Sequence, residues 1–178
     1  ESSILLRQVE AQIVEGWAVA ESGDPTRGVS RAESALATAR QLGAQIWDSS
    51  WYLLLAKAYV CAGRLSEARA ALQTAFGAAN GNGEHACTAE LHRFDGELRL
   101  ANSGAHAEAE RCFLTAVELA RQQRARLWEL RAAMSLSRLW ETQGKRKEAY
   151  DLLAPIYDWF TEGFDTKDLK EARLLLDD

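Results

Sequence analysis

The chain has 178 residues, 47% of them hydrophobic and 26% charged, so it falls in the range of ordinary globular proteins. Its net charge of -5 disfavours a nucleic-acid-binding module, which needs a concentrated positive field to neutralise phosphates. No apolar run has the length of a transmembrane helix, and no secretory signal pattern opens the chain, so we expect no membrane partner.

Three cysteines, Cys61, Cys87 and Cys112, form an odd number with no paired spacing. We expect each to lie in a helix as a small buried side chain, in a reducing, cytoplasmic protein. The chain begins at Glu1 and not at Met, which suggests a piece of a longer protein.

Strong helix formers dominate the sequence, and four glycines each end a run of apolar residues at helical spacing. These are Gly23, Gly63, Gly104 and Gly144, separated by 40, 41 and 40 residues. The period predicts four hairpins, with helices at 4–22 and 26–42, 46–62 and 65–79, 85–102 and 106–123, and 127–143 and 146–161. The junction at 39–47 also resembles that at 120–128, two periods later.

We therefore expect an all-α fold in one domain spanning 1–178. Its repeats lie at about 4–43, 44–83, 84–124 and 125–162, and a capping helix lies at about 166–177. Each second helix carries a small residue five positions after the turn glycine, which lets the two helices approach closely; these are Gly28, Ala68, Ala109 and Ala149. An apolar face follows at helical spacing, formed by Ala32, Ala35, Leu72, Ala75, Phe113, Ala116, Leu153 and Ile156.

The second repeat resembles the tetratricopeptide repeat family. Tyr59, Gly63, Ala68, Leu72 and Ala75 match the family's aromatic, turn glycine, small, large and small positions. The fourth repeat matches at Trp140, Gly144, Ala149 and Leu153. The resemblance implies a right-handed superhelix of four hairpins, in which the first helices line a concave surface that binds proteins.

Three features depart from that family. The aromatic position of the third repeat is Leu100, and either Gly96 or Glu97 fills its small position. Gly28 replaces alanine in the first repeat. The period exceeds the family's usual length of about 34 residues, so armadillo-type repeats are the alternative.

A narrower resemblance covers the carboxyl end. The run 129–177 is similar to the end of the helical-repeat region in large bacterial ATPase-linked regulators, such as class III adenylate cyclases. This implies an interaction or sensor module with any catalysis upstream of Glu1. Pro155 predicts a kink or break near residues 153–154. Gly163 and Asp165 predict a helix stop and a cap before a lid helix that carries Leu169, Ala172, Leu175 and Leu176.

Catalytic and metal-binding motifs are missing from the sequence. It contains no phosphate-binding GxxxxGK[ST] loop, no HExxH and no CxxC. His85 and His92 lie near Cys87 but lack converging partners, and His106 stands apart, so we expect no metal, no cofactor and no enzymatic activity. We interpret the run 80–83 as a helix stop, and the basic runs 121–126 and 145–147 as solvated helix ends.

Six tryptophans are numerous for this length. Trp47, Trp128 and Trp140 fall on packing or junction positions, whereas Trp17 and Trp51 are the better candidates for exposure. Trp159 precedes the lid helix.

The family resemblance places the binding groove on the first helices. The candidates carried over are Glu10, Ile13, Trp17, Glu21, Ser50, Leu53, Lys57, Cys61, Leu91, Phe94, Leu98, Arg131, Met134, Arg138 and Glu141. Apolar side chains flanked by Lys57, Arg131 and Arg138 suit an acidic amphipathic peptide. The leading hypothesis is a non-catalytic scaffold that binds a protein or peptide partner, or another domain of the same polypeptide, within a bacterial signalling or transcriptional regulatory protein. The alternative is a sensor that binds a small-molecule inducer on the concave face.

Overall fold

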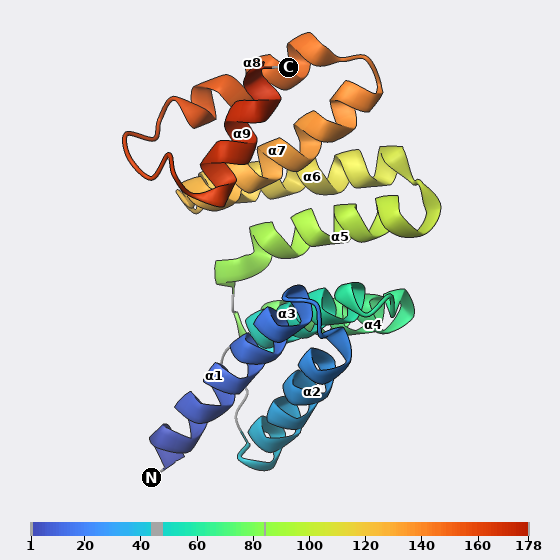
Figure 1. The fold of residues 1–178 in the computed structure, drawn as a ribbon, viewed down its shortest axis with the longest axis vertical. Coiled ribbons are helices and arrows are strands. Elements are labelled where there is room, and N and C mark those ends of the chain that lie inside the picture. The colour runs from blue at the N-terminus through green and yellow to red at the C-terminus, as the bar shows by residue number, and fades with distance from the viewer. Residues whose placement is uncertain (1, 44–47, 84, 178) are drawn as a thin grey trace. The chain divides into compact units, whose positions relative to one another are not determined.

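The computed structural model describes residues 2–43, 48–83 and 85–177 of the chain. Over these residues the backbone forms nine α-helices and no strand, which confirms the all-α prediction (Figure 1). The helices are α1 (Ser2–Glu21), α2 (Pro25–Gln41), α3 (Asp48–Cys61), α4 (Leu65–Asn82), α5 (Thr88–Ser103), α6 (His106–Gln122), α7 (Arg126–Thr142), α8 (Arg146–Tyr157) and α9 (Lys167–Asp177), with a 3-10 turn, η1, at His85–Cys87.

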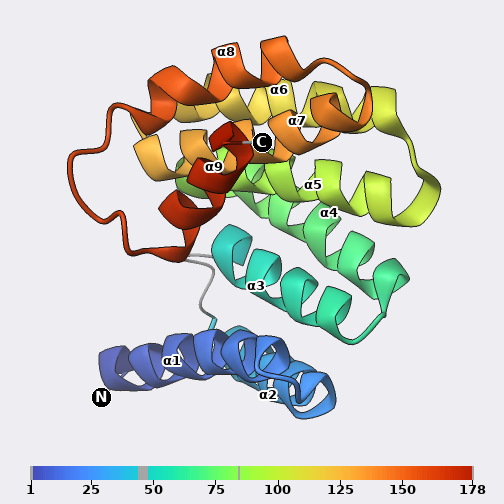
Figure 2. The ribbon, with the colours of Figure 1, turned by 45° about the horizontal axis from the view of Figure 1, so that its top comes forward.

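The chain divides into two compact units. Unit 1 is Glu1–Cys87 and unit 2 is Thr88–Asp178. In unit 1, α1 pairs with α2 and α3 pairs with α4, while α3 also packs on α1 and α2. In unit 2, α5 pairs with α6, α7 packs on α5, α6 and α8, and α9 lies against α7 and α8 (Figure 2). The prediction of one continuous domain stays a prediction.

The helix boundaries lie close to those predicted. The largest differences are at α4, which continues to Asn82, at α5, which begins after η1, and at α8, which ends at Tyr157. The first two residues of the helix expected at 46–62, which include Trp47, lie outside the described residues.

The four periodic glycines all adopt the left-handed backbone that ends a helix. Their φ angles are 103° at Gly23, 70° at Gly63, 60° at Gly104 and 77° at Gly144. The matching junctions two periods apart also share this conformation, because φ is 68° at Gly43, which ends α2, and 55° at Arg124, which ends α6. Glycine adopts such a φ without penalty and arginine does not, so the α6–α7 junction stores some strain.

Small residues stand where the two helices of each hairpin cross. Ala68, Ala109 and Ala149 are buried as predicted. Gly28 is explained by a still closer approach of α1 and α2, because a Cβ built on it would lie 2.5 Å from both the Gly16 carbonyl oxygen and the Ala20 nitrogen. The first repeat therefore departs from alanine because its backbones touch.

The register of the third repeat is set by Gly96. A Cβ at this position would overlap the ring of Phe113, which is almost fully buried on α6. Glu97 instead hydrogen-bonds Arg93 along α5. Of the two alternatives, Gly96 is thus the small residue that faces the second helix.

The aromatic residue near the end of a first helix bonds to the hairpin before it. Tyr59 Oη donates to Glu33 Oε1 at 2.6 Å, and Trp140 Nε1 donates to Glu110 Oε1 at 2.7 Å. Lys145 adds an ion pair to Glu110 at 3.5 Å. In both units, then, an aromatic side chain supplies a specific polar link between successive hairpins as well as apolar contact.

Helix α9 covers the apolar face of the last hairpin, as predicted. Leu169 and Ala172 are buried in the cluster that also contains Leu130, Leu153 and Ile156, and Leu175 and Leu176 pack against it half-buried. An uncovered end of a helical stack would expose this apolar surface to water.

Two expectations about this end of the chain are wrong. The expected break is absent, because α8 is continuous through Leu153 and Ala154 and ends two residues after Pro155; the expected kink stays a prediction. The proline removes one backbone donor, its own bond to the carbonyl four residues earlier, and in the last turn this loss does not stop the helix before Tyr157. Asp165 does not occupy the cap position either, since α9 begins at Lys167 and Thr166 directly precedes it.

Candidate protein-binding surfaces

Six of the predicted groove residues are buried and offer little surface to a partner. All are at most 6% exposed. The first helices pack against neighbours on several sides, so rows of residues assigned to a groove instead fill the core. The six are Ile13, Leu53, Leu91, Phe94, Leu98 and Met134.

Four of the remaining predicted residues form two pairs in unit 1, one helical turn apart along α1 and α3. The Lys57 ammonium lies 5.8 Å from the centre of the Trp17 ring, and both side chains are half-buried. Burial raises the pKa of the Cys61 thiol, and the negative charge of the nearby Glu21 raises it further. We call Trp17, Glu21, Lys57 and Cys61 the unit 1 patch. The expectation that Cys61 is buried is wrong, since it is exposed at the end of α3.

The other tryptophans divide differently from the prediction. Trp51, expected to be exposed, is buried in α3. Trp128 and Trp140 are half-buried, and Trp159 is exposed beside Arg126, whose guanidinium carbon lies 5.2 Å from its ring centre. Trp17 Nε1 is enclosed and has no hydrogen-bond partner among the described residues.

Glu10 and Ser50 are half-buried elsewhere on the first helices of unit 1. Glu10 pairs with Arg7 at 3.3 Å on the exposed side of α1. The unit 1 patch does not include them.

The predicted arginines of unit 2 are paired with the last helix. Arg131 donates two hydrogen bonds to the Asp168 carboxylate, at 3.0 and 2.7 Å, and Arg138 donates to Glu171 at 2.7 Å. The hydrogen bond to Asp168 raises the pKa of Arg131. Glu141 lies near the other end of α9, where it borders a cavity of about 290 Å³. Both arginines thus already hold carboxylates that α9 supplies.

Sequence reasoning missed a buried ionic network beside these pairs. Arg93 donates to both carboxylate oxygens of the buried Glu90, at 2.7 and 2.8 Å, and also bonds to Glu97 and Ser135. Burial alone would lower the pKa of Arg93, but its bonds to the two glutamates raise it. The spacing Glu90, Arg93, Glu97 on one helix face is a signal that could have found it.

A second ionic cluster lies at the α6–α7 junction. Arg121 and Arg126 each hydrogen-bond the buried Glu129, both at 2.7 Å. The interpretation of the run 121–126 as a solvated helix end is therefore incomplete, because two of its arginines neutralise a carboxylate in the core.

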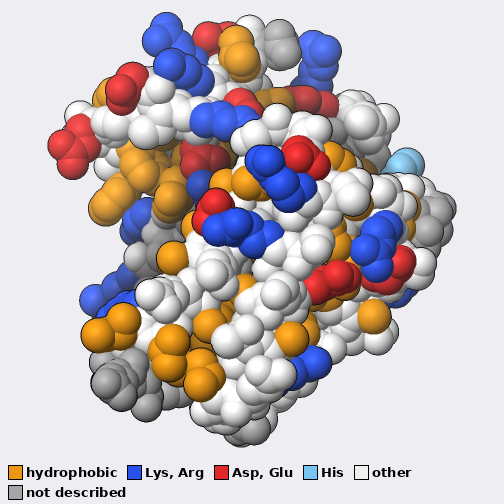
Figure 3. Space-filling view, turned by 60° about the horizontal axis from the view of Figure 1, so that its bottom comes forward, with side chains coloured by type: hydrophobic (Ala, Val, Ile, Leu, Met, Phe, Trp, Pro, Cys, Tyr) orange, Lys and Arg blue, Asp and Glu red, His pale blue; other side chains and the backbone are white. Residues whose placement is uncertain are grey.

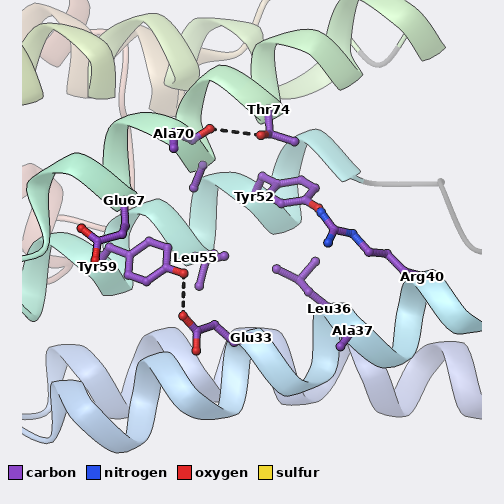
Figure 4. Close-up of a pocket in the computed structure, with 11 residues that line it drawn as sticks. Glu33, Leu36, Ala37, Arg40, Tyr52, Leu55, Tyr59, Glu67, Ala70 and Thr74 are labelled. Atoms are coloured by element: carbon purple, nitrogen blue, oxygen red, sulfur yellow. Dashed lines mark hydrogen bonds between the residues drawn. The ribbon is translucent and has the colours of Figure 1, made fainter.

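A groove in unit 1 was not predicted. It has a volume of about 350 Å³, and its described lining residues come from α2, α3 and α4 (Figure 4). Apolar residues and aromatic rings of α3 lie between the charged side chains of α2 and α4. Its lining is Glu33, Leu36, Ala37, Arg40, Tyr52, Leu55, Tyr59, Glu67, Ala70, Ala71 and Thr74. The small side chains of α2 and α4 in this lining do not fill the space beside the two tyrosines of α3.

The two ends of this α2–α4 groove differ chemically. At one end Arg64 pairs with Glu33 at 3.6 Å and Glu67 at 2.9 Å, while Glu33 also accepts the Tyr59 hydrogen bond. Burial and this bond raise the pKa of Tyr59 to about 12. At the other end an Arg40 nitrogen donates to the hydroxyl oxygen of Tyr52.

A cysteine, a histidine and an aspartate do come together in unit 2, but they do not form a nucleophile. Cys112 Sγ lies 3.3 Å from Asp95 Oδ2, in a cavity of about 370 Å³ that His92 also lines. Burial, and then the hydrogen bond to Asp95, raise the pKa of Cys112 to about 11. The thiol is therefore protonated at neutral pH, whereas a nucleophilic cysteine needs a lowered pKa.

The remaining sequence motifs have structural roles. Helix α4 continues through Asn80 to Asn82, and Gly83, whose φ is 68°, caps it. Lys147 pairs with Asp151 at 2.5 Å on the exposed side of α8. Among the residues that the structure describes, no group of three or more His, Cys, Asp or Glu side chains is placed to hold a metal ion.

Surface charges of both signs are mixed. On the face drawn in Figure 3, Lys and Arg side chains lie beside Asp and Glu and do not merge into one basic patch. None of the helices in the described ranges is long and apolar enough to cross a membrane.

The paired helices, the turn glycines and the small residues at the crossings define a helical-repeat fold like that of tetratricopeptide repeats. No protein-family model matches the sequence, and no curated protein matches it significantly. Solved structures do share the fold. The nearly identical TPR-like repeats of a kinesin light chain-like protein from Podosopora anserina give a TM-score of 0.70 at 18% identity, over 96% of this chain and 84% of that one.

BtubC (BKLC) from P. vanneervenii gives a TM-score of 0.72 at 17% identity, over 99% of this chain and 82% of that one. Identities this low establish the fold alone. They confirm the tetratricopeptide-like resemblance and do not extend to the resemblance with ATPase-linked regulators.

Proposed function

We propose that this chain is a non-catalytic scaffold that binds a segment of a partner protein through the unit 1 patch on α1 and α3. The observation that carries the proposal is the Lys57 ammonium 5.8 Å from the Trp17 ring centre, on the first helices of two successive hairpins. Tryptophan and cationic side chains that are partly exposed together are typical of the residues that dominate protein interfaces.

The charges of the patch define the partner. The Lys57 ammonium binds an acidic group of the partner. The carboxylate of Glu21, beside Cys61, disfavours a second anion nearby. The partner segment therefore presents an apolar side chain to Trp17 and one carboxylate to Lys57. At unit 2 an acidic segment would have to compete with Asp168 and Glu171 for Arg131 and Arg138.

In its wider setting, this scaffold is a module of a bacterial signalling or transcriptional regulatory protein in the cytoplasm. Its support is the similarity of the run 129–177 to the end of such regulators. In that setting the bound segment belongs to another protein or to another domain of the same polypeptide. An inducer bound on the first-helix face stays the alternative hypothesis.

Affinity capture with quantitative mass spectrometry tests the scaffold. Lys57→Glu is expected to reduce capture of the specific partner at least tenfold without changing the melting temperature, while Arg69→Glu, an exposed arginine on α4, leaves capture intact. Equal capture by the wild type and Lys57→Glu would refute the assignment. A captured small metabolite in place of a protein would favour the sensor.

A further inference from the structure

One end of the α2–α4 groove carries two hydrogen-bond donors, Arg40 and Tyr52, and among the described residues that line the groove no carboxylate lies between them. An Arg40 nitrogen donates to the Tyr52 hydroxyl oxygen, so the hydroxyl proton of Tyr52 remains available to another acceptor. A guanidinium carries five N–H groups, and Arg40 forms no ion pair within the part of the chain that the structure describes. Both donors border the groove, as Figure 4 shows.

The opposite end offers no comparable site. Arg64 lies between Glu33 and Glu67, and Tyr59 donates its proton to Glu33. One guanidinium between two carboxylates leaves this end with a net negative charge, which repels an incoming anion. An anionic group entering the groove is therefore directed to the Arg40 end, which gives a bound segment a defined orientation.

The floor between the two ends is apolar. Leu36 and Leu55 are largely buried beneath the groove, and Ala37 and Ala70 lie at its edges without side chains long enough to fill it. Glu33 and Arg40 are seven residues apart on α2, which corresponds to about 10 Å along the helix axis. That length accommodates roughly three residues of an extended chain.

We propose that the α2–α4 groove is a second protein-binding site, which takes an apolar segment of a partner protein carrying one Asp or Glu. The carboxylate of that residue accepts hydrogen bonds from Arg40 and Tyr52, and an apolar side chain two to four residues away packs over Leu36 and Leu55. Charge complementarity selects this occupant, because the one unpaired charge that borders the groove in the described chain is a guanidinium. No residue of the groove belongs to the unit 1 patch, so the two sites are independent.

Nuclear magnetic resonance titration of the uniformly ¹⁵N-labelled chain tests this site. The probes are three peptides blocked at both ends, in which a Leu-Leu pair precedes Glu with a spacing of two, three or four residues. Each has a matched peptide with Gln in place of Glu. At least one Glu peptide is expected to shift amide signals of α2, α3 and α4 saturably, with its Gln counterpart binding about tenfold more weakly or worse.

Variants locate the carboxylate. Arg40→Gln is expected to raise the Kd of the Glu peptide about tenfold or more, and Tyr52→Phe, which keeps the ring, about threefold. Arg69→Gln removes the same charge from an exposed position of α4 outside the groove and leaves the Kd unchanged. Unchanged signal dispersion in each variant verifies that it is folded.

The other outcomes overturn the proposal. No saturable shift with any Glu peptide, equal binding of the Glu and Gln peptides, or unchanged affinity in Arg40→Gln would each do so. Shifts confined to α1 and the Lys57 side of α3 would move the site to the unit 1 patch. Tighter binding of a Leu-Leu peptide that lacks Glu and has a free carboxyl end would replace the side-chain carboxylate by a chain terminus.

Discussion

The crossing of α1 and α2 gives the sharpest test of the packing. In Gly28→Ala the new methyl group would lie 2.5 Å from the Ala20 nitrogen and from the Gly16 carbonyl oxygen. Both are backbone atoms, so a rotamer change cannot relieve the contact and the helices must separate. Overpacking of a core costs about 1–3 kcal/mol, and a contact with backbone on both sides belongs at the upper end. Replacing glycine by alanine in a helix returns at most about 1 kcal/mol, so we expect a net loss of about 2 kcal/mol.

Gly77→Ala is the matched control. Gly77 is exposed inside α4, and a Cβ there would meet nothing within 4 Å. The same substitution should therefore stabilise unit 1 by about 0.5–1 kcal/mol. Urea unfolding followed by circular dichroism measures both variants, which act on the same unit. A Gly28→Ala protein as stable as the wild type would show that α1 and α2 do not touch as described.

Two further predictions concern single residues. The folded state raises the pKa of Tyr59 from 10.0 to about 12, chiefly by burial and then by the bond to Glu33; the stabilisation is therefore complete below pH 10 and is lost as the pH rises through about 12. Urea unfolding between pH 9 and 12 should show a steeper loss of stability in the wild type than in Tyr59→Phe, and parallel curves would contradict the assignment. Arg124→Gly should raise the free energy of unfolding by up to about 1 kcal/mol, since glycine relieves the left-handed backbone; a lower melting temperature would mean that the arginine side chain outweighs the strain.

The pairing of α9 with α7 bears on how the scaffold is used. Arg131 and Arg138 are cations on a first helix, where an acidic partner would be expected, yet Asp168 and Glu171 hold them. These pairs are half-exposed, so each contributes little to stability. Their consequence is specificity, because an acidic segment would have to displace Asp168 and Glu171 to reach these arginines.

Local signals in the sequence determined the helices, their turns and the closest contacts between them. The φ of Gly63 follows from the need to end one helix and begin another within a few residues, which only glycine does without strain. Ala68 and Ala109 are small because helix axes cross there, and that requirement recurs with the repeat. The lid residues Leu169 and Ala172 could be predicted because an apolar stripe on the last helix needs a surface to cover.

Only the tertiary structure decided which side chains remain at the surface. In α3, Trp51, Leu53, Leu55 and Tyr59 are all buried although they point to different sides of the helix. Helical periodicity identifies one buried face, but a helix enclosed by its partner and by neighbouring hairpins has several, so the sequence could not separate groove from core. Nor could it join Arg40 to Tyr52, since the two lie on different hairpins and meet only when these pack. The turn and crossing positions of the repeat are set by contacts within one hairpin, whereas Arg40 and Tyr52 come together through contacts between hairpins.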